Sequence, residues 1–191
     1  MAPPGQLMVM TRATPVRREV HRSLAPLQLT ETVGHALFPS RNWHQSLSDW
    51  HSPARLDALR RACNQLPAHA FCFRLDRFVS TGREPGSIHW ALRSKHGDPI
   101  GFLELLAALR NAFMANGISD KCAHTAHMTL SYFAEQSIPN ADIDPVDWVI
   151  DSIELVAAYG HGDTYRYETI ETWPLLPMMH TLPTQLGLPT R

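Results

Sequence analysis

The chain has 191 residues, a length that fits one domain able to bury about 70% of its unfolded surface. Its composition, 44% hydrophobic and 18% charged with a net charge of −1, excludes a global basic field that would attract long nucleic acids. Three cysteines without a CxxC spacing argue against a disulfide framework, and the sequence shows neither a signal peptide nor an apolar membrane span. We therefore expect a cytoplasmic protein that does not associate with membranes.

Alternating apolar residues predict strands, and apolar residues three or four positions apart predict helices. The first expected elements are a strand over 6–11, a helix over 15–29 with Thr14 as its N-cap, one or two strands over 35–50, a helix over 53–66, and strands over 69–76 and 88–92. They are followed by a helix over 99–116 that Gly117 ends, a strand around His127, a loop over 139–145, and strands over 148–157 and 165–173. This order predicts an α+β protein with mostly antiparallel strands.

Two segments carry a histidine and a hydroxyl side chain inside apolar, strand-like runs. One holds His44 and Ser46, the other holds His127 and Thr129, and the two histidines lie 83 positions apart. Because side chains alternate in a strand, each histidine shares a face with its hydroxyl. Two such units facing each other would supply paired imidazoles for general acid–base chemistry on a phosphoester. His44 and His127 are therefore the candidate catalytic residues.

The tripeptide His-x-[Ser/Thr] is not specific by itself. With 11 histidines in the chain, chance alone predicts about 1.4 matches, and the chain has three. The third match, His21 with Ser23, follows Thr14 and Pro15, a pair typical of a helix start. The strand-like setting distinguishes the other two motifs.

The chain also shows signs of an internal duplication. His44 follows Pro15 by 29 residues and His127 follows Pro99 by 28, and both prolines begin predicted helices. Each unit would consist of a helix, a return loop and a strand that bears the histidine. A pseudo-twofold arrangement of the units would place the two strands side by side across a cleft.

The paired motifs resemble those of the 2H phosphoesterase superfamily, and within it the bacterial 2′-5′ RNA ligase group, also described as RNA 2′,3′-cyclic phosphodiesterases. Residues 42–47 look like that group's Asn-Leu-His-x-Thr-Leu, residues 75–92 like its middle hairpin and residues 160–175 like its closing hairpin. The resemblance covers roughly residues 6–176 and is weaker over 1–29. It implies a bilobed α+β fold, with two mostly antiparallel sheets related by a pseudo-twofold around a central cleft and helices on the outside. Residues 1–176 would form this single domain, and 177–191 an irregular C-terminal tail.

Two imidazoles can hold opposite protonation states near neutral pH, as ring opening of a cyclic phosphodiester by water requires. Ser46 and Thr129 could donate hydrogen bonds to the non-bridging oxygens, so neither a metal nor another cofactor is expected. The residue pattern does not assign acid and base. The resemblance implies that His44 is the proton donor to the 3′-oxygen and His127 the proton acceptor that activates water, leaving a 2′-phosphate. The same site run backwards would join a 2′,3′-cyclic end to a 5′-hydroxyl.

Two positions depart from the pattern of the group. Ser46 stands where threonine is usual, which keeps the hydroxyl, and Tyr132 stands where an arginine is common, five residues after the second histidine. Tyr132 can still hydrogen-bond a phosphate and is our third candidate phosphate-binding residue, but it brings no charge. The expected substrates are RNA ends with a 2′,3′-cyclic phosphate, tRNA among them, or cyclic nucleotides. We expect a monomer.

Other functions fit the same residues. The chemistry could act on another small substrate such as ADP-ribose cyclic phosphate or 2′-5′ oligoadenylate, or the chain could be a nucleotide- or RNA-binding module with little turnover. His124, near Cys122 and His127, raises a zinc hydrolase as a further alternative. A strand would place His124 and His127 on opposite faces, so no metal ligand set is expected. Trp43 and Trp90 are expected in the core rather than as base-stacking residues.

Overall fold

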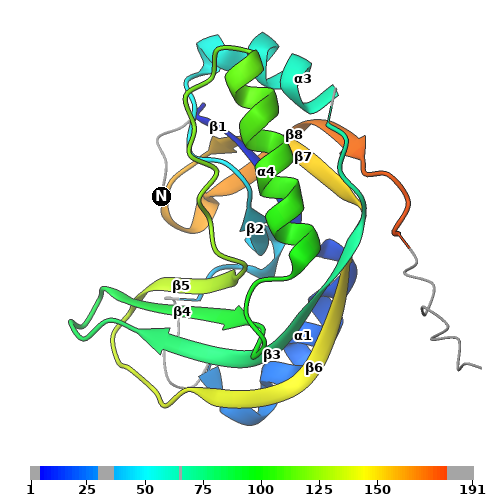
Figure 1. Cartoon of the computed structure of the whole chain (residues 1–191). Helices are drawn as coiled ribbons and strands as arrows, with labels where there is room; N and C mark the ends of the chain where they lie inside the picture. Colours follow the sequence, from blue (N-terminus) through cyan, green and yellow to red (C-terminus); the bar gives the residue numbers. More distant parts are fainter. Residues whose placement is uncertain (1–4, 30–36, 65, 180–191) are drawn as a thin grey trace, which may run out of the picture.

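Two four-stranded antiparallel sheets form the framework of the computed structural model, which describes residues 5–29, 37–64 and 66–179 (Figure 1). The first sheet has the order β2-β1-β7-β8 and the second the order β5-β4-β3-β6. The strands of the first sheet are β1 (Leu7–Arg12), β2 (His44–Ser46), β7 (Ser152–Tyr159) and β8 (Arg166–Pro174). Those of the second are β3 (Phe71–Thr81), β4 (Ile88–Arg93), β5 (Met128–Ala134) and β6 (Ala141–Ile150).

The α-helices lie on the outside of these sheets. They are α1 (Arg17–Leu24), α3 (Leu56–Asn64) and α4 (Ile100–Ala115). Helices α3 and α4 lie together at one end of the molecule, and α1 lies beside β6 at the other (Figure 1). Phe102 near the start of α4 packs against Phe71 of β3, and Phe113 near its end packs against His51, which follows β2. Helix α4 thus contacts both halves. Within the described ranges, no helix is long and apolar enough to cross a membrane.

The two sheets have matching orders. In each, a strand, a helix and an edge strand follow one another in the chain, as β1-α1-β2 in the first half and β4-α4-β5 in the second. Both edge strands carry a candidate motif, because His44 begins β2 and His127 directly precedes β5. The predicted α+β class with two antiparallel sheets is confirmed, and the equivalent orders agree with the predicted duplication.

Strand alternation places the core side of each motif as the sequence predicted. Trp43, Gln45 and Leu47, which flank the first histidine, are buried, whereas His44 and Ser46 are half-buried. In the second motif Met128 and Leu130 are fully buried. Trp43 and Trp90 belong to the main hydrophobic core, as expected.

The predicted helix over 15–29 is wrong in its extent. It is divided into the 3-10 helix Thr14–Val16, helix α1 and the 3-10 helix Ala25–Leu27. Pro26 explains the second break, because proline lacks the N–H that a continuous α-helix needs. The N-cap is Ala13 rather than Thr14, whose hydroxyl instead accepts a hydrogen bond from Arg17.

The predicted strand over 148–157 is also wrong, because the chain turns at Asp151 and continues in the other sheet. Strand β6 ends at Ile150, and β7 begins at Ser152. The predicted loop over 139–145 is largely part of β6, which tolerates Pro145 because it is an edge strand with an irregular register there. The predicted tail over 177–191 lies mostly outside the described residues.

Smaller differences affect two other segments. The segment over 35–50 contains one short strand, β2, which follows a 3-10 helix at Ser40–Asn42, and its first two residues lie outside the described ranges. In the helix predicted over 99–116, Leu103 is 50% exposed, whereas Leu105 is buried. The stop at Gly117 is confirmed by its positive φ of 68°.

The edges of the two sheets are joined by the side chain of Gln45. Its Oε1 accepts a hydrogen bond from the backbone N–H of His127, and its Nε2 donates to the carbonyls of Ser46 and Thr125. The side chain is fully buried, with 0% exposure. A buried amide with both donors and its acceptor engaged fixes the relative position of the two segments.

We predict that Gln45→Met destabilises the protein by about 2 kcal/mol, because an apolar side chain of similar size leaves the partly buried N–H of His127 without its acceptor and removes both hydrogen bonds that the amide donates. The free energy of unfolding is measured by urea denaturation. Glu104→Met, at an exposed position of α4, is the control for the added apolar side chain and should cost less than about 0.5 kcal/mol. Equal stability of Gln45→Met and the wild type would show that this amide does not join the two sheets.

Candidate active site

The two motif histidines have the same hydrogen-bond pattern. Nδ1 of His44 lies 2.7 Å from the carbonyl oxygen of Asn42, and Nδ1 of His127 lies 2.8 Å from that of Thr125, in each case two residues upstream. A carbonyl oxygen only accepts, so each Nδ1 carries a proton and donates it. In both histidines Nε2 is therefore the nitrogen that gains or loses a proton.

An arginine lies beside each histidine at the end of the neighbouring strand. Arg12, the last residue of β1, pairs with His44 in the β1–β2 register. Arg93 ends β4, and because Leu92 pairs with Met128, the next pair along places Arg93 opposite His127. The equivalent positions of the two arginines follow the equivalent orders of the two sheets.

These surroundings lower the pKa of both histidines. Burial lowers the pKa of His44 to about 4, and the nearby charges of His127 and Arg12 add to the effect against the opposing hydrogen bond to Asn42. Burial also lowers the pKa of His127, and Arg93 contributes in the same direction. Both are neutral at pH 7 when no anion is bound.

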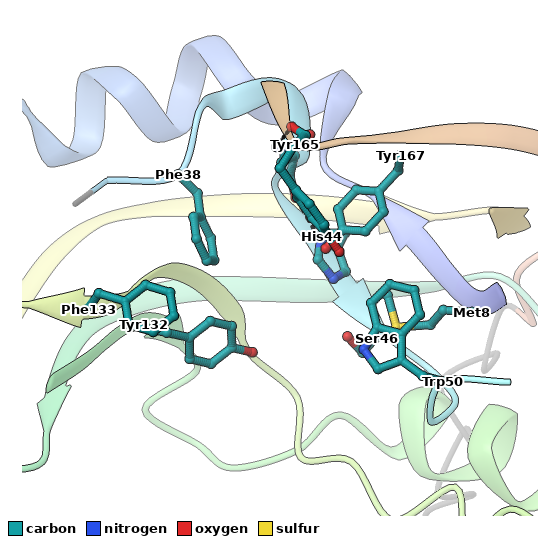
Figure 2. A pocket seen from close by; sticks show the side chains of 10 residues that line it. Met8, Phe38, His44, Ser46, Trp50, Tyr132, Phe133, Tyr165 and Tyr167 are labelled. Atoms are coloured by element: carbon teal, nitrogen blue, oxygen red, sulfur yellow. Dashed lines mark hydrogen bonds between the residues drawn. The ribbon is translucent and has the colours of Figure 1, made fainter. Parts of the chain in front are cut away.

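A pocket of about 600 Å³ opens in front of His44 (Figure 2). Besides His44 and Ser46, most of its lining is aromatic: Phe38, Trp50, Tyr132, Phe133, Tyr165 and Tyr167. Trp50 and Tyr167 are stacked, with ring centroids 6.1 Å apart, and the rings of Tyr167 and His44 meet edge to face at 4.9 Å. The pocket is formed by side chains of both halves and offers flat apolar walls beside a proton-transfer group.

The five predicted site residues lie in two groups. His44, Ser46 and Tyr132 line the pocket. His127 and Thr129, the two candidate residues of the second motif, are not among the residues that line the pocket, and the Thr129 side chain is buried, with 6% exposure. The Thr129 hydroxyl connects the groups, because it donates to the phenol oxygen of Tyr132 at 3.3 Å.

Four residues of the site were not predicted from the sequence: His89, Arg12, Arg93 and Gln45. His89 carried a detectable signal, because it alternates with buried residues of β4 and therefore faces the opposite side, where the second motif lies. If the predicted duplicated unit is extended to include the strand before each helix, it begins with β1 and β4, and each of these strands ends in an arginine. Alternation also indicates that Gln45 lies on the side opposite His44, but nothing in the sequence indicates that its amide bonds the backbone of the second motif.

No group of three or more His, Cys, Asp or Glu side chains that could hold a metal ion occurs among the described residues. His124, considered as a zinc ligand, instead lies 3.8 Å from a carboxylate oxygen of Asp49. Its other neighbour in the sequence, Cys122, is buried, and its backbone N–H donates to Asp120.

Neither a family model nor a curated protein matches the sequence. Solved structures do match the fold. A crystal structure of E. coli LigT complexed with ATP has a TM-score of 0.70 at 18% identity and covers 91% of this chain and 99% of its own. TT0787 of Thermus thermophilus has a TM-score of 0.68 at 16% identity, with 89% and 97% covered. The PDE domain of MHV ns2 has a TM-score of 0.51 at 16% identity, with 80% and 98% covered.

These similarities extend over both sheets and the helices outside them, because the match to LigT covers nine-tenths of the chain. A crystal structure described as a phosphoesterase matches equally well, with a TM-score of 0.72 at 18% identity. The chain therefore has the α+β fold of the 2H phosphoesterases.

Proposed function

We propose that this protein is a metal-independent phosphodiesterase of the 2H superfamily, which opens 2′,3′-cyclic phosphate termini of RNA or nucleotides to 2′-phosphates. The observation that carries the proposal is the matched pair His44 and His127. Each is held with Nε2 as its titrating nitrogen, and each lies where the edge strand of one sheet begins, His44 as its first residue and His127 directly before it. A module that only bound its ligand would not need two proton-transfer groups. The shared fold with LigT and a phosphoesterase supports the same reaction class.

The two histidines would divide the proton transfers. Nε2 of neutral His127 accepts a proton from the water that attacks phosphorus, and Nε2–H of protonated His44 donates to the departing 3′-oxygen. The P–O3′ bond breaks as the P–O(water) bond forms, and the phosphate stays on the 2′-oxygen. Ser46 and Tyr132, which line the pocket, supply neutral donors for the non-bridging oxygens, where negative charge concentrates. Thr129, the other phosphate-binding candidate, donates to the phenol oxygen of Tyr132 and acts through it.

The aromatic pocket supports a substrate that contains a base. Flat side chains such as Trp50 and Tyr167 offer stacking surfaces that accept any nucleobase. LigT, which shares the fold, has been crystallised with ATP and with 3′-AMP, which supports a nucleotide as ligand. An RNA terminus, that of a tRNA included, would present the same cyclic phosphate and base.

The proposal predicts hydrolysis of 2′,3′-cyclic AMP, and of a short RNA with the same terminus, in excess EDTA. Phosphorus NMR should show a 2′-phosphate as the product, because the 3′-oxygen is the leaving group. A loss of turnover on chelation would favour a zinc hydrolase instead. No turnover of either substrate, with or without metal, would overturn the proposed function and leave the binding module as the alternative.

We predict that His44→Ala and His127→Ala each lower kcat/KM at least ~100-fold, the usual effect of a lost acid or base. A cyclic substrate with sulfur at the 3′ bridging position separates the roles, because a thiolate leaves without a proton from the enzyme. This substrate should restore most of the activity of His44→Ala and little of that of His127→Ala.

The matched control is His21→Ala, which alters the third His-x-Ser motif on the exposed surface of α1 and should change kcat/KM less than about threefold. Restoration of His127→Ala rather than His44→Ala by the sulfur substrate would reverse the assignment of acid and base.

Proton uptake should accompany binding of the anionic phosphodiester. The pKa of His44 is about 4 without a ligand, and a bound anion raises it, so the complex gains a proton. Affinity should therefore rise as the pH falls from the raised pKa toward 4. The uptake is measured by calorimetry of 2′,3′-cyclic AMP binding to the His127→Asn variant, which cannot turn the ligand over, in buffers of different ionisation enthalpy. Adding His44→Gln should abolish it, and unchanged uptake in this double variant would exclude His44 as the proton acceptor.

A further inference from the structure

A third histidine approaches the second motif from strand β4. Ile88, Trp90 and Leu92 of this strand are buried in the core, so the alternate residues His89, Ala91 and Arg93 face the other side. The β4–β5 register shifts on both sides of Trp90, between Ile88 and Trp90 and again between Trp90 and Ala91. Such bulges redirect side chains.

His89 is joined to the second motif by a continuous set of contacts. Its Nε2 lies 3.1 Å from Oγ1 of Thr129, which in turn donates to the phenol oxygen of Tyr132 at 3.3 Å. The Thr129 hydroxyl has a single proton, and that proton is directed at Tyr132. The contact with His89 is therefore a hydrogen bond only if His89 donates from Nε2.

The direction of the hydrogen bonds from His89 through Thr129 decides where the hydroxyl proton of Tyr132 points. Tyr132 accepts from Thr129, so its own hydroxyl proton is available to a further acceptor, and Tyr132 lines the pocket in front of His44 (Figure 2). The ring of His89 also stacks on that of Tyr132, with centroids 4.8 Å apart and an interplanar angle of 18°. His89 thus holds Tyr132 in two ways, through the stack and through Thr129.

The charges around His89 favour its neutral, single-donor form. Its ring meets that of His127 edge to face at 5.6 Å, and Arg93 follows four residues later on the same side of β4. Burial lowers the pKa of His89 to about 4, and His127 and Arg93 contribute in the same direction. A neutral imidazole has one N–H, and the hydrogen bond to Thr129 places it on Nε2.

We propose that His89 is a positioning residue, whose Nε2–H directs a chain of donors through Thr129 to Tyr132, so that the Tyr132 hydroxyl donates to a non-bridging oxygen of the phosphodiester. This proposal rests on the proposed function. It gives the site a neutral donor at the position where the resembling family commonly carries arginine. It also predicts that His89 has the opposite tautomer to His44 and His127, which carry their protons on Nδ1.

A double-mutant cycle on kcat/KM for 2′,3′-cyclic AMP tests the chain. His89→Phe keeps a planar ring to stack on Tyr132 but removes the N–H, and Tyr132→Phe removes the terminal hydroxyl. Each should lower kcat/KM about 10-fold, and the double variant should be no more than about threefold worse than either. His89→Gln, which can place an amide N–H near the Nε2 position, should stay within about threefold of the wild type.

Two outcomes would overturn the proposal. If kcat/KM of the double variant falls by the product of the two single losses, His89 and Tyr132 act independently. If His89→Gln loses as much kcat/KM as His89→Phe, the N–H is not needed. The exposed His96, in the turn after β4, supplies the control His96→Gln, which should leave kcat/KM unchanged. Urea denaturation of every variant separates a folding defect from a loss of positioning.

A second measurement does not depend on turnover. Nitrogen-15 NMR of histidine-labelled protein at pH 7 should show an Nε2–H tautomer that disappears in His89→Gln, alongside Nδ1–H tautomers for the two motif histidines. An Nδ1–H tautomer for His89 would overturn the proposed chain of donors even if the enzyme is active. If the wild type does not hydrolyse cyclic phosphates, the proposed function fails, and the tautomer still decides whether the donor chain exists.

Discussion

The buried amide of Gln45 is the constraint on which the rest of the site depends. It belongs to the first motif, yet its oxygen accepts from the backbone of His127 and its nitrogen donates to the carbonyl of Thr125 in the second. A shift of one residue in β2 would turn Gln45 toward the pocket and His44 toward the core, leaving the backbone N–H of His127 without its acceptor. Burial of the amide therefore fixes both the register of a three-residue edge strand and the distance between two sheets.

The near symmetry of the halves gives the two histidines equivalent surroundings, whereas the proposed reaction needs them to differ. Both hold Nδ1 on a carbonyl, both lie beside an arginine at a strand end, and both have a lowered pKa. The difference comes from other groups. His44 contacts the aromatic pocket through Tyr167, whereas His127 contacts His89. An anionic substrate placed asymmetrically between them would raise the two pKa values by different amounts, and so assign acid and base.

Sequence alone predicted the parts of this fold whose periodicity is strong. The alternation around His44 and in β4 correctly placed the buried and cleft-facing sides, and Gly117 correctly ended α4. It failed where one residue redirects the chain. The turn at Asp151 joins two apolar strands of different sheets without a glycine or proline, so the pattern predicted one strand. Alternation indicates which faces His89 and Gln45 occupy, but their roles arise from contacts between distant segments, which no local pattern contains.

Tyr132 places a neutral hydroxyl where the resembling group commonly carries an arginine, and this difference has a consequence for the proposed reaction cycle. The cyclic substrate carries one negative charge, whereas the 2′-phosphate product carries nearly two at neutral pH. Attraction to a fixed cation grows with the charge of the ligand, so an arginine would stabilise the bound product more than the bound substrate. The neutral Tyr132 hydroxyl, which Thr129 contacts, would donate one hydrogen bond to either ligand. A site built with Tyr132 would therefore discriminate less in favour of its product, and would release it more readily than a site with arginine at this position.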